Sequence, residues 1–141
     1  MAAVVTDMLE RLLGYQLRQA QARTFAHFMT TMASDKITPG QFGVLSLIEG
    51  NPGLTQSALA TALGIERSTM VGVISALEKR KLVKRGRAAT DRRSYALSLT
   101  AKGRSRQERV KVKVDSHEQA ITGNLDKNEK QLLRELLKKI G

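Results

Sequence analysis

The sequence predicts a mainly α-helical fold of the α+β class, in which six helices and a two-stranded β-hairpin form one domain over residues 1–141. Three observations support this fold. Apolar residues recur every three or four positions over most of the chain, the period of a buried helix face. Residues 95–99 instead alternate with period two, as a half-buried strand does. A hydrophobic fraction of 41% suffices for one modest core.

The N-terminal half is expected to be helical. Residues 5–32 carry one continuous apolar stripe and predict a single long helix, which the polar run 34–36 ends. Thr38 is a suitable N-cap and Pro39 suits the first helical position, so a second helix runs to about Glu49. Gly, Asn and Pro residues then predict a turn.

Two helices in close succession follow, over residues 56–62 and 66–81, with Thr55 as the cap of the first. Between them, Gly64 supplies a residue that adopts a left-handed backbone without a steric penalty. This spacing is typical of a DNA-binding helix-turn-helix. A plain helical hairpin is the alternative, because many such hairpins use glycine in the turn.

The remaining elements are a hairpin and two helices. Residues 82–84 and 95–99 predict strands joined by a long, basic tip. Thr100 caps a helix that reaches Gly123; residues 110–114 alternate like a strand, but helix-forming neighbours favour the helix. Asp126 begins the last helix, which carries an apolar stripe of leucines.

Basic residues are concentrated in one quarter of the chain. The net charge is +11, and the window 78–113, with 14 basic and three acidic residues, carries all of the excess. Such a distribution indicates a polyanionic partner, most commonly nucleic acid. A generally basic surface is the alternative. A membrane surface is disfavoured because the window lacks a long apolar face. No stretch suits a spanning helix or a secretory signal, so a cytoplasmic protein is expected.

In a helix-turn-helix the second helix enters the major groove with its N-terminus first. Arg67 would then read a guanine edge or hold a phosphate, and Gly72 would let the backbone approach DNA. For Ser68 the alternative is a simple N-cap. The DNA-contact candidates, including the basic hairpin, are Thr55, Gln56, Arg67, Ser68, Thr69, Gly72, Ser75, Arg85, Arg87, Arg92 and Arg93.

The run Asp-Arg-Arg-Ser-Tyr-Ala-Leu-Ser-Leu-Thr-Ala-Lys-Gly at 91–103 closely resembles the wing of MarR-type (multiple antibiotic resistance) regulators, as does the stretch 77–85. The order of elements resembles that family over nearly the whole chain. Two positions depart from its pattern: Lys81 stands where the family often has Gly, and Ser68 where it often has Pro.

The resemblance implies a dimeric winged helix-turn-helix protein of prokaryotic origin. Residues 5–33 and 101–141 would dimerise, and residues 38–100 would bind double-stranded DNA at a pseudo-palindromic operator, usually as a repressor. A small phenolic, aromatic acid or thioester effector would bind between these regions and release the DNA. Asp91 and Arg93 correspond to the pair that braces the wing. Beside them, Arg92 is the candidate for minor-groove insertion.

Aromatic and methionine side chains on the first two helices, with one arginine among them, are candidates for holding an aromatic carboxylate. Packing in the core or in a dimer interface is the alternative for each. The candidate pocket residues are Tyr15, Arg18, Phe25, His27, Phe28, Met29, Phe42 and Leu45.

Enzyme chemistry is not predicted. The chain has no Cys, no phosphate-binding glycine loop, no helical His pair and no nucleophile elbow. His27 and His117 are too few to predict a metal, although a paired metal-sensor site stays open. No cofactor is expected. The alternatives to a regulator are a non-specific nucleic-acid architectural protein and a winged-helix module that binds protein.

Overall fold

The computed structural model describes residues 2–87 and 95–141. The elements within these ranges are α1 (Asp7–Glu10), α2 (Leu13–Thr31), α3 (Pro39–Gly50), α4 (Gln56–Leu63), α5 (Arg67–Lys79), β1 (Val83–Arg87), β2 (Tyr95–Leu99), α6 (Ala101–Ile121) and α7 (Lys127–Lys138). The predicted mainly α-helical fold with one β-hairpin is confirmed.

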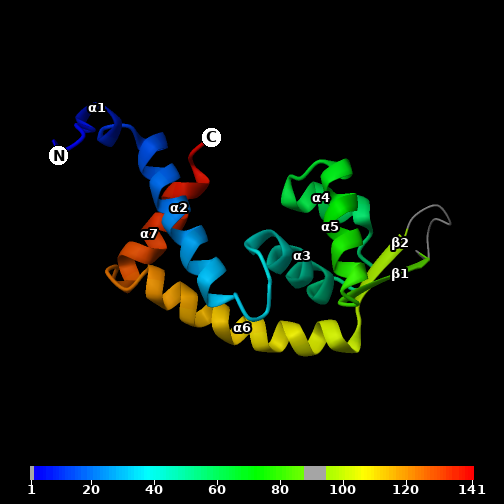
Figure 1. The fold of residues 1–141 in the computed structure, drawn as a ribbon. Coiled ribbons are helices and arrows are strands. Elements are labelled where there is room, and N and C mark those ends of the chain that lie inside the picture. Colours follow the sequence, from blue (N-terminus) through cyan, green and yellow to red (C-terminus); the bar gives the residue numbers. More distant parts are fainter. Residues whose placement is uncertain (1, 88–94) are drawn as a thin grey trace.

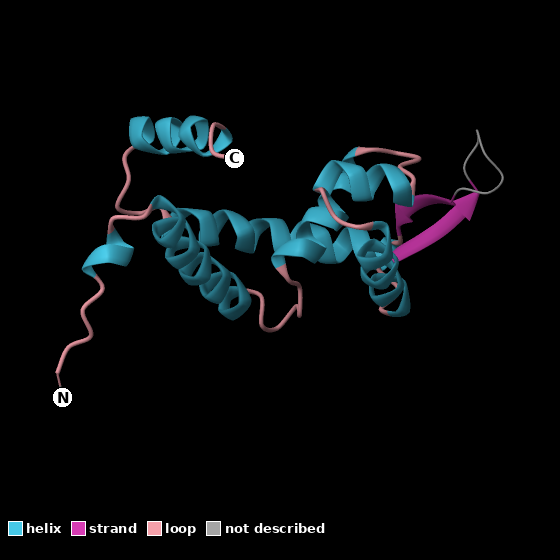
Figure 2. Cartoon of the chain, turned by 90° about the horizontal axis from the view of Figure 1, so that it is seen from above, coloured by secondary structure: helices cyan, strands magenta, loops and turns pink. Residues whose placement is uncertain are grey.

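The long helix α6 joins two regions of an elongated molecule (Figures 1 and 2). At one end of α6, helices α3, α4 and α5 gather with the hairpin. At the other end lie α2, α7 and both termini (Figure 1). Contacts of α6 with α2, α3 and β2 connect the two regions, and α2 also contacts α3 directly, so α6 is one element through which one region can influence the other.

The prediction of a single helix over residues 5–32 is wrong. The chain is extended at Leu12 (φ −89°, ψ 123°), which separates the short α1 from α2 and raises the six expected helices to seven in the described ranges. Leu9 and Leu13 are 45% and 73% exposed. Helices depend mostly on tertiary packing for stability, and this stripe has little to pack against within its own chain.

The other helices lie within about two residues of their predicted bounds, and the predicted caps are confirmed. The Thr38 hydroxyl accepts a hydrogen bond from the Gln41 amide in a capping box, with Pro39 in the first turn. Thr55, Thr100 and Asp126 cap α4, α6 and α7 in the same way. The alternating segment 110–114 is helical, as expected.

The hydrophobic core lies in the region of α3, α4, α5 and the hairpin. Leu45, Met70 and Leu77 are completely buried there, and Val110 brings α6 into the same cluster. The strands pair antiparallel from Val83↔Leu99 to Arg87↔Tyr95. Alternate residues of β2 face this core, which confirms the half-buried strand.

The start of α6 is fixed against the end of the helix-turn-helix region. A Cβ atom on Gly103 would lie 2.0 Å from the carbonyl oxygen of Leu82, so only glycine fits there. The Thr100 hydroxyl donates to the Lys81 carbonyl at 2.6 Å, and the Thr100 amide donates to the Leu82 carbonyl at 3.1 Å. These contacts orient α6 relative to the hairpin.

Candidate nucleic-acid interface and effector cavity

The helices α4 and α5 form the predicted helix-turn-helix. Gly64 has φ 63° and ψ 33°, the left-handed conformation that glycine adopts most easily. The Ile65 amide donates to the Ala60 carbonyl at 3.0 Å and the Gly64 amide to the Thr61 carbonyl at 3.2 Å, the two bonds of a Schellman motif. Ile65 packs against the core, which fixes the angle between the helices.

One face of α5 is buried and the opposite face is exposed. Met70, Ile74 and Leu77 are 0% exposed. The exposed face carries all the candidates from this helix, which are Arg67, Ser68, Thr69, Gly72 and Ser75. Ser68 is the second residue of α5 and Glu66 occupies the N-cap, so Ser68 is not the cap. A Cβ on Gly72 would meet nothing within 4 Å, so the fold itself does not require glycine there.

At the start of α4, the side chains of Thr55 and Gln56 are only partly exposed. The Thr55 hydroxyl already accepts a hydrogen bond from the Ala58 amide at 3.2 Å. The neighbouring backbone is nevertheless the N-terminus of a helix, where N–H groups point outward and favour an anion.

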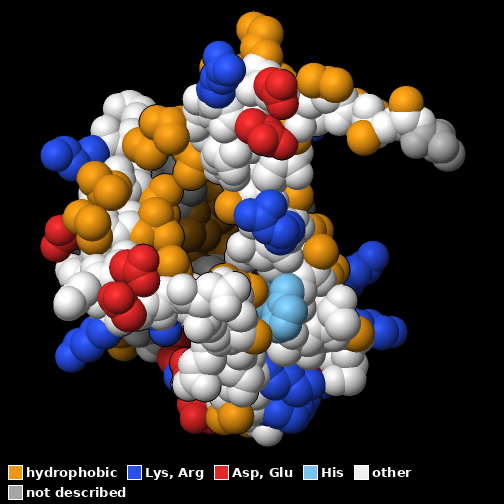
Figure 3. Space-filling model, turned by 90° about the vertical axis from the view of Figure 1, so that its left-hand side faces the viewer, with side chains coloured by type: hydrophobic (Ala, Val, Ile, Leu, Met, Phe, Trp, Pro, Cys, Tyr) orange, Lys and Arg blue, Asp and Glu red, His pale blue; other side chains and the backbone are white. Residues whose placement is uncertain are grey.

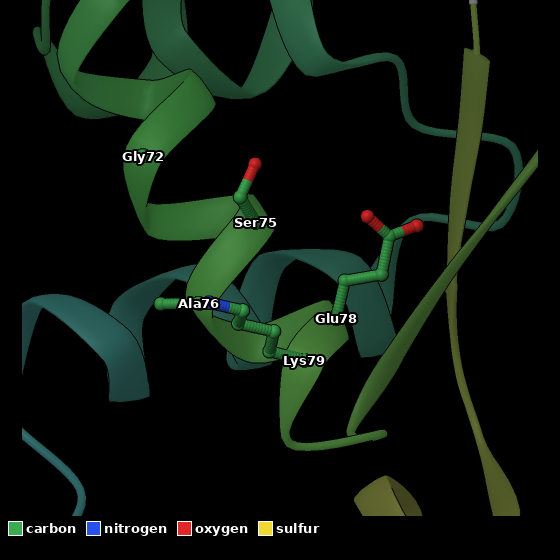
Figure 4. Close-up of a pocket in the computed structure, with 5 residues that line it drawn as sticks. All are labelled: Gly72, Ser75, Ala76, Glu78 and Lys79. Atoms are coloured by element: carbon green, nitrogen blue, oxygen red, sulfur yellow. The ribbon is translucent and has the colours of Figure 1, made fainter.

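A shallow groove runs along α5 beside the hairpin, lined by Gly72, Ser75, Ala76, Glu78 and Lys79 (Figure 4). The Glu78 side chain points toward the strands (Figure 4). The Arg85 guanidinium, from β1, lies 3.4 Å from the Glu78 carboxylate and donates to the Ser75 hydroxyl at 3.4 Å. Arg85 is therefore held against α5, a pairing that the sequence analysis missed.

The wing candidates are described only in part. Arg87 ends β1, where its backbone pairs with Tyr95. Asp91, Arg92 and Arg93 lie outside the described residues. The predicted wing brace and the predicted insertion of Arg92 stay predictions.

A cavity of about 660 Å³ lies between α2, α3, α6 and α7. The same end of the molecule is visibly hollowed, with hydrophobic side chains around the hollow (Figure 3). The walls are mainly apolar, and they include Leu17, Phe25, Phe28, Phe42, Val114 and Leu133. Such a space suits an aromatic molecule.

The lining differs from the predicted pocket. Phe25, Phe28 and Phe42 line the cavity, but the other predicted residues do not: Tyr15, Arg18, His27, Met29 and Leu45. Leu45 is completely buried in the core. The α2 residues of the lining are 17, 20, 21, 24, 25 and 28, one helix stripe. Arg18 lies at the edge of this stripe, about 100° from Leu17 but only about 20° from Phe25 around the helix axis, and it does not line the cavity. The sequence did not predict the lining residues from α6 and α7, since the apolar stripes of these helices indicated only packing.

Two histidines meet beside this cavity. The Nδ1 atoms of His27 and His117 lie 2.8 Å apart, so one donates a hydrogen bond to the other. His117 is 2% exposed and lines the cavity. Its ring stands edge-on to Phe28, with centroids 5.2 Å apart. Burial, and secondarily the neighbouring His27, lower the pKa of His117, against a weaker opposite effect of Glu118. The ring is therefore neutral at neutral pH.

A buried carboxylate ties the α2–α3 loop to α6. Asp35 is 3% exposed, and its carboxylate accepts hydrogen bonds from Arg109 at 2.9 Å and Lys113 at 2.5 Å. Burial alone would raise the pKa of Asp35, but these hydrogen bonds outweigh it and the pKa is lowered. The Asp35 carbonyl also accepts from Arg80, which follows α5, and from Arg106. The end of α5, the α2–α3 loop and α6 thus share one cluster of contacts.

Metal and membrane sites receive no support from residues 2–87 and 95–141. Within them, no three His, Cys, Asp or Glu side chains are grouped so as to hold a metal ion. Nor do these ranges contain a helix with the length and hydropathy needed to cross a membrane.

Comparison with known proteins identifies relatives over the whole chain. A transcriptional regulatory protein assigned to the hcr operon of Thauera aromatica is 36% identical, over 99% of this chain and 85% of its own. The transcriptional repressor CouR, solved with a 23-mer DNA duplex, is 40% identical with a TM-score of 0.92 and covers 98% of each chain. CouR bound to p-coumaroyl-CoA is 39% identical with a TM-score of 0.86, over 97% of this chain and 95% of that one.

The sequence pattern of the MarR family matches residues 35–94, from the Asp35 cluster to the wing. The helix-turn-helix, the hairpin and the full-length relatives all agree with this match. The chain therefore belongs to the MarR family of winged helix-turn-helix transcriptional regulators.

Proposed function

We propose that this protein is a sequence-specific transcriptional repressor that binds a pseudo-palindromic operator as a homodimer and is released by a small organic effector. The observation that carries the proposal is the polar, exposed face of α5 in a helix-turn-helix whose other face is buried. The relative CouR, at 40% identity, has been solved on a DNA duplex. We also propose that the protein acts in the cytoplasm and that it catalyses no reaction.

The DNA-binding surface combines α5 with the hairpin. The first turn of α5, beginning at Arg67, would enter the major groove, where Arg recognises guanine edges. The basic hairpin tip, with Arg92, would reach the adjacent minor groove. The charge of +11 supports a strong contribution from phosphate contacts.

Dimerisation would use residues 5–33 and 101–141, and residues 38–100 would form the DNA-binding region. No residue of α7 is buried within the chain, although Leu133, Leu136 and Leu137 form an apolar stripe. Leu9 and Leu12 are similarly exposed at the other terminus. A second copy of the chain would cover these stripes, since large exposed apolar patches mark interfaces.

The effector would occupy the cavity between α2, α3, α6 and α7. Its phenylalanine walls favour an aromatic molecule, whether a phenol, an aromatic acid or an aromatic thioester. The relative CouR has been solved with p-coumaroyl-CoA. Because α6 contacts both α2 and the hairpin, a ligand that shifts α6 would alter the spacing of the two α5 helices in the homodimer.

The proposal is tested by measuring binding to DNA from upstream of the protein's own gene and to a random duplex of equal length. Fluorescence anisotropy at fixed salt should give a preference of ~10³-fold or more for one short palindromic site. Equal affinity for both duplexes would instead identify a non-specific architectural protein. If the protein binds neither duplex, the remaining alternative is a winged-helix module that binds another protein.

A further inference from the structure

We propose that His117 is the polar anchor of the effector cavity and that it selects an effector whose enclosed aromatic end carries an uncharged hydroxyl group. This inference rests on the proposed function and specifies the ligand of the same site. It assigns to His117 a contact with the effector, and to His27 the positioning of the His117 ring.

The cavity lining contains no lysine or arginine in the part of the chain that the structure describes. Its acidic side chain is Glu118, and Arg18 does not contribute. A carboxylate enclosed here would lose its water without gaining a counter-charge, which is strongly unfavourable. The interior therefore disfavours the carboxylate end of an aromatic acid.

A neutral hydroxyl group has a partner in the same space. Among the polar residues of the lining, His117 is the one that is buried, at 2% exposure; Gln21 and Glu118 are exposed, and Thr24 and Thr122 are partly exposed. His117 is thus the polar side chain set most deeply in the wall. Its Nδ1 is already engaged by His27 at 2.8 Å.

The pairing of the two Nδ1 atoms leaves Nε2 of His117 for a ligand, since the described residues offer Nε2 no hydrogen-bond partner. If His117 accepts at Nδ1, its proton lies on Nε2, which then donates; if it donates at Nδ1, Nε2 accepts. A phenolic hydroxyl both donates and accepts, so it fits either arrangement. A carboxylate only accepts.

The walls around His117 suit the ring that would carry this hydroxyl. Phe28 stands edge-on to His117, and the Phe28 and Phe42 rings are tilted by 53° with centroids 6.4 Å apart. Aromatic rings prefer such edge-on and tilted neighbours. The phenol would therefore enter among these rings, with its hydroxyl directed at the imidazole.

The test uses three synthetic probes that differ only at the para position: the N-acetylcysteamine thioesters of 4-hydroxycinnamate, cinnamate and 4-carboxycinnamate. Calorimetry on the full-length protein gives each dissociation constant without DNA. We expect the hydroxyl probe to bind at least about 10-fold more tightly than the unsubstituted probe, since a buried polar partner left unpaired penalises the analogue. The carboxyl probe should bind most weakly.

His117→Phe should reduce the hydroxyl preference to about one while binding of the unsubstituted probe persists. His117→Gln keeps a hydrogen-bond donor and an acceptor and should therefore retain part of the hydroxyl preference. It provides the test if His117→Phe does not fold. Thr24→Val is the matched control, since it removes a different polar group from the same lining, one to which the proposal assigns no contact with the effector. It should leave the preference unchanged.

Three results would overturn the inference: a hydroxyl preference that survives in both His117 variants, tightest binding of the carboxyl probe, or no binding of any probe. Operator binding is measured in parallel for each protein. Loss of the proposed function would appear as equal affinity for operator and random DNA in the wild type. Failure of the inference alone would leave operator preference intact.

Discussion

The Arg109 guanidinium donates a hydrogen bond from Nε to Oδ1 of the Asp35 carboxylate at 2.9 Å, and a terminal nitrogen of the same guanidinium forms an ion pair with that oxygen at 2.8 Å. This contact joins the loop before α3 to the middle of α6. The same loop accepts hydrogen bonds from Arg80 through the carbonyls of Asp35 and Lys36. The end of α5 and the cavity-lining helix α6 therefore meet at one buried acidic residue.

Replacing Asp35 should destabilise the fold. Asp35→Asn is expected to lower the free energy of unfolding by about 3 kcal/mol. This is the lower end of the usual range for removing one partner of a buried ion pair, because Arg109 and Lys113 are themselves partly exposed. Chemical denaturation at fixed protein concentration measures the change. The control is Glu49→Gln, which removes the partly exposed pair with Lys111 and should lower the free energy of unfolding far less, since water screens an exposed pair. Equal losses would contradict a special role for Asp35.

Stability should depend on pH through His117. Its folded-state pKa lies below the ordinary 6.5, so below pH 6.5 the unfolded chain takes up a proton that the folded chain does not. The free energy of unfolding should therefore decline as the pH falls from 6.5 through the lowered pKa, with no contribution from His117 above 6.5. In His117→Gln this part of the decline should vanish. The same acid slope in both proteins would assign the effect to other groups.

Lys81 occupies a position better suited to glycine. It has φ 59° and follows α5 in a Schellman motif, with hydrogen bonds from the Lys81 amide to Glu78 and from the Leu82 amide to Leu77. Lys81→Gly should raise the free energy of unfolding by about 0.5–1 kcal/mol, since relief of left-handed strain exceeds the added entropy of the unfolded chain. Lys81→Ala keeps the Cβ and should give no such gain in a denaturation series.

Two glycines should respond in opposite ways to alanine. Gly103→Ala places a methyl group against the Leu82 carbonyl and should cost about 1–3 kcal/mol, the usual penalty of overpacking. Gly72→Ala has open space around it and should stabilise α5 by up to about 1 kcal/mol. Operator affinity should nevertheless fall in Gly72→Ala if the backbone lies close to DNA. Unchanged affinity would place DNA farther from this turn.

The DNA-contact predictions can be separated by salt. If Arg92 contacts only phosphate, Arg92→Ala should weaken binding by ~1–3 kcal/mol and reduce the slope of log affinity against log salt by about one on both operator and random duplexes. Arg67→Ala should weaken the operator preferentially if Arg67 reads a base. The control is Arg23→Ala, which removes the same charge from an exposed position. Arg23 belongs to α2, which lies in the other region of the molecule from α5 (Figure 1). Unchanged affinity and slope in Arg92→Ala would remove the hairpin tip from the interface.

The sequence by itself determined the elements that depend on local chemistry. Thr38, Thr55, Thr100 and Asp126 cap helices as predicted, because a cap bonds to amides two or three residues away. Gly64 makes the turn because its conformation is a property of the residue itself. These local choices sufficed to predict the winged helix-turn-helix and its exposed α5 face.

Tertiary structure alone decided the contacts between distant residues. His27 and His117 meet across 90 positions, and Asp35 reaches Arg109 across 74; neither pairing leaves a periodic signal in the sequence. Arg18 lies two turns before Phe25 on the same side of α2, yet only Phe25 lines the cavity, because the packing of α2 against α6 decides which residues of the helix face the space between them. The break at Leu12 also followed from packing, since an apolar stripe without a partner in its own chain does not keep a helix continuous.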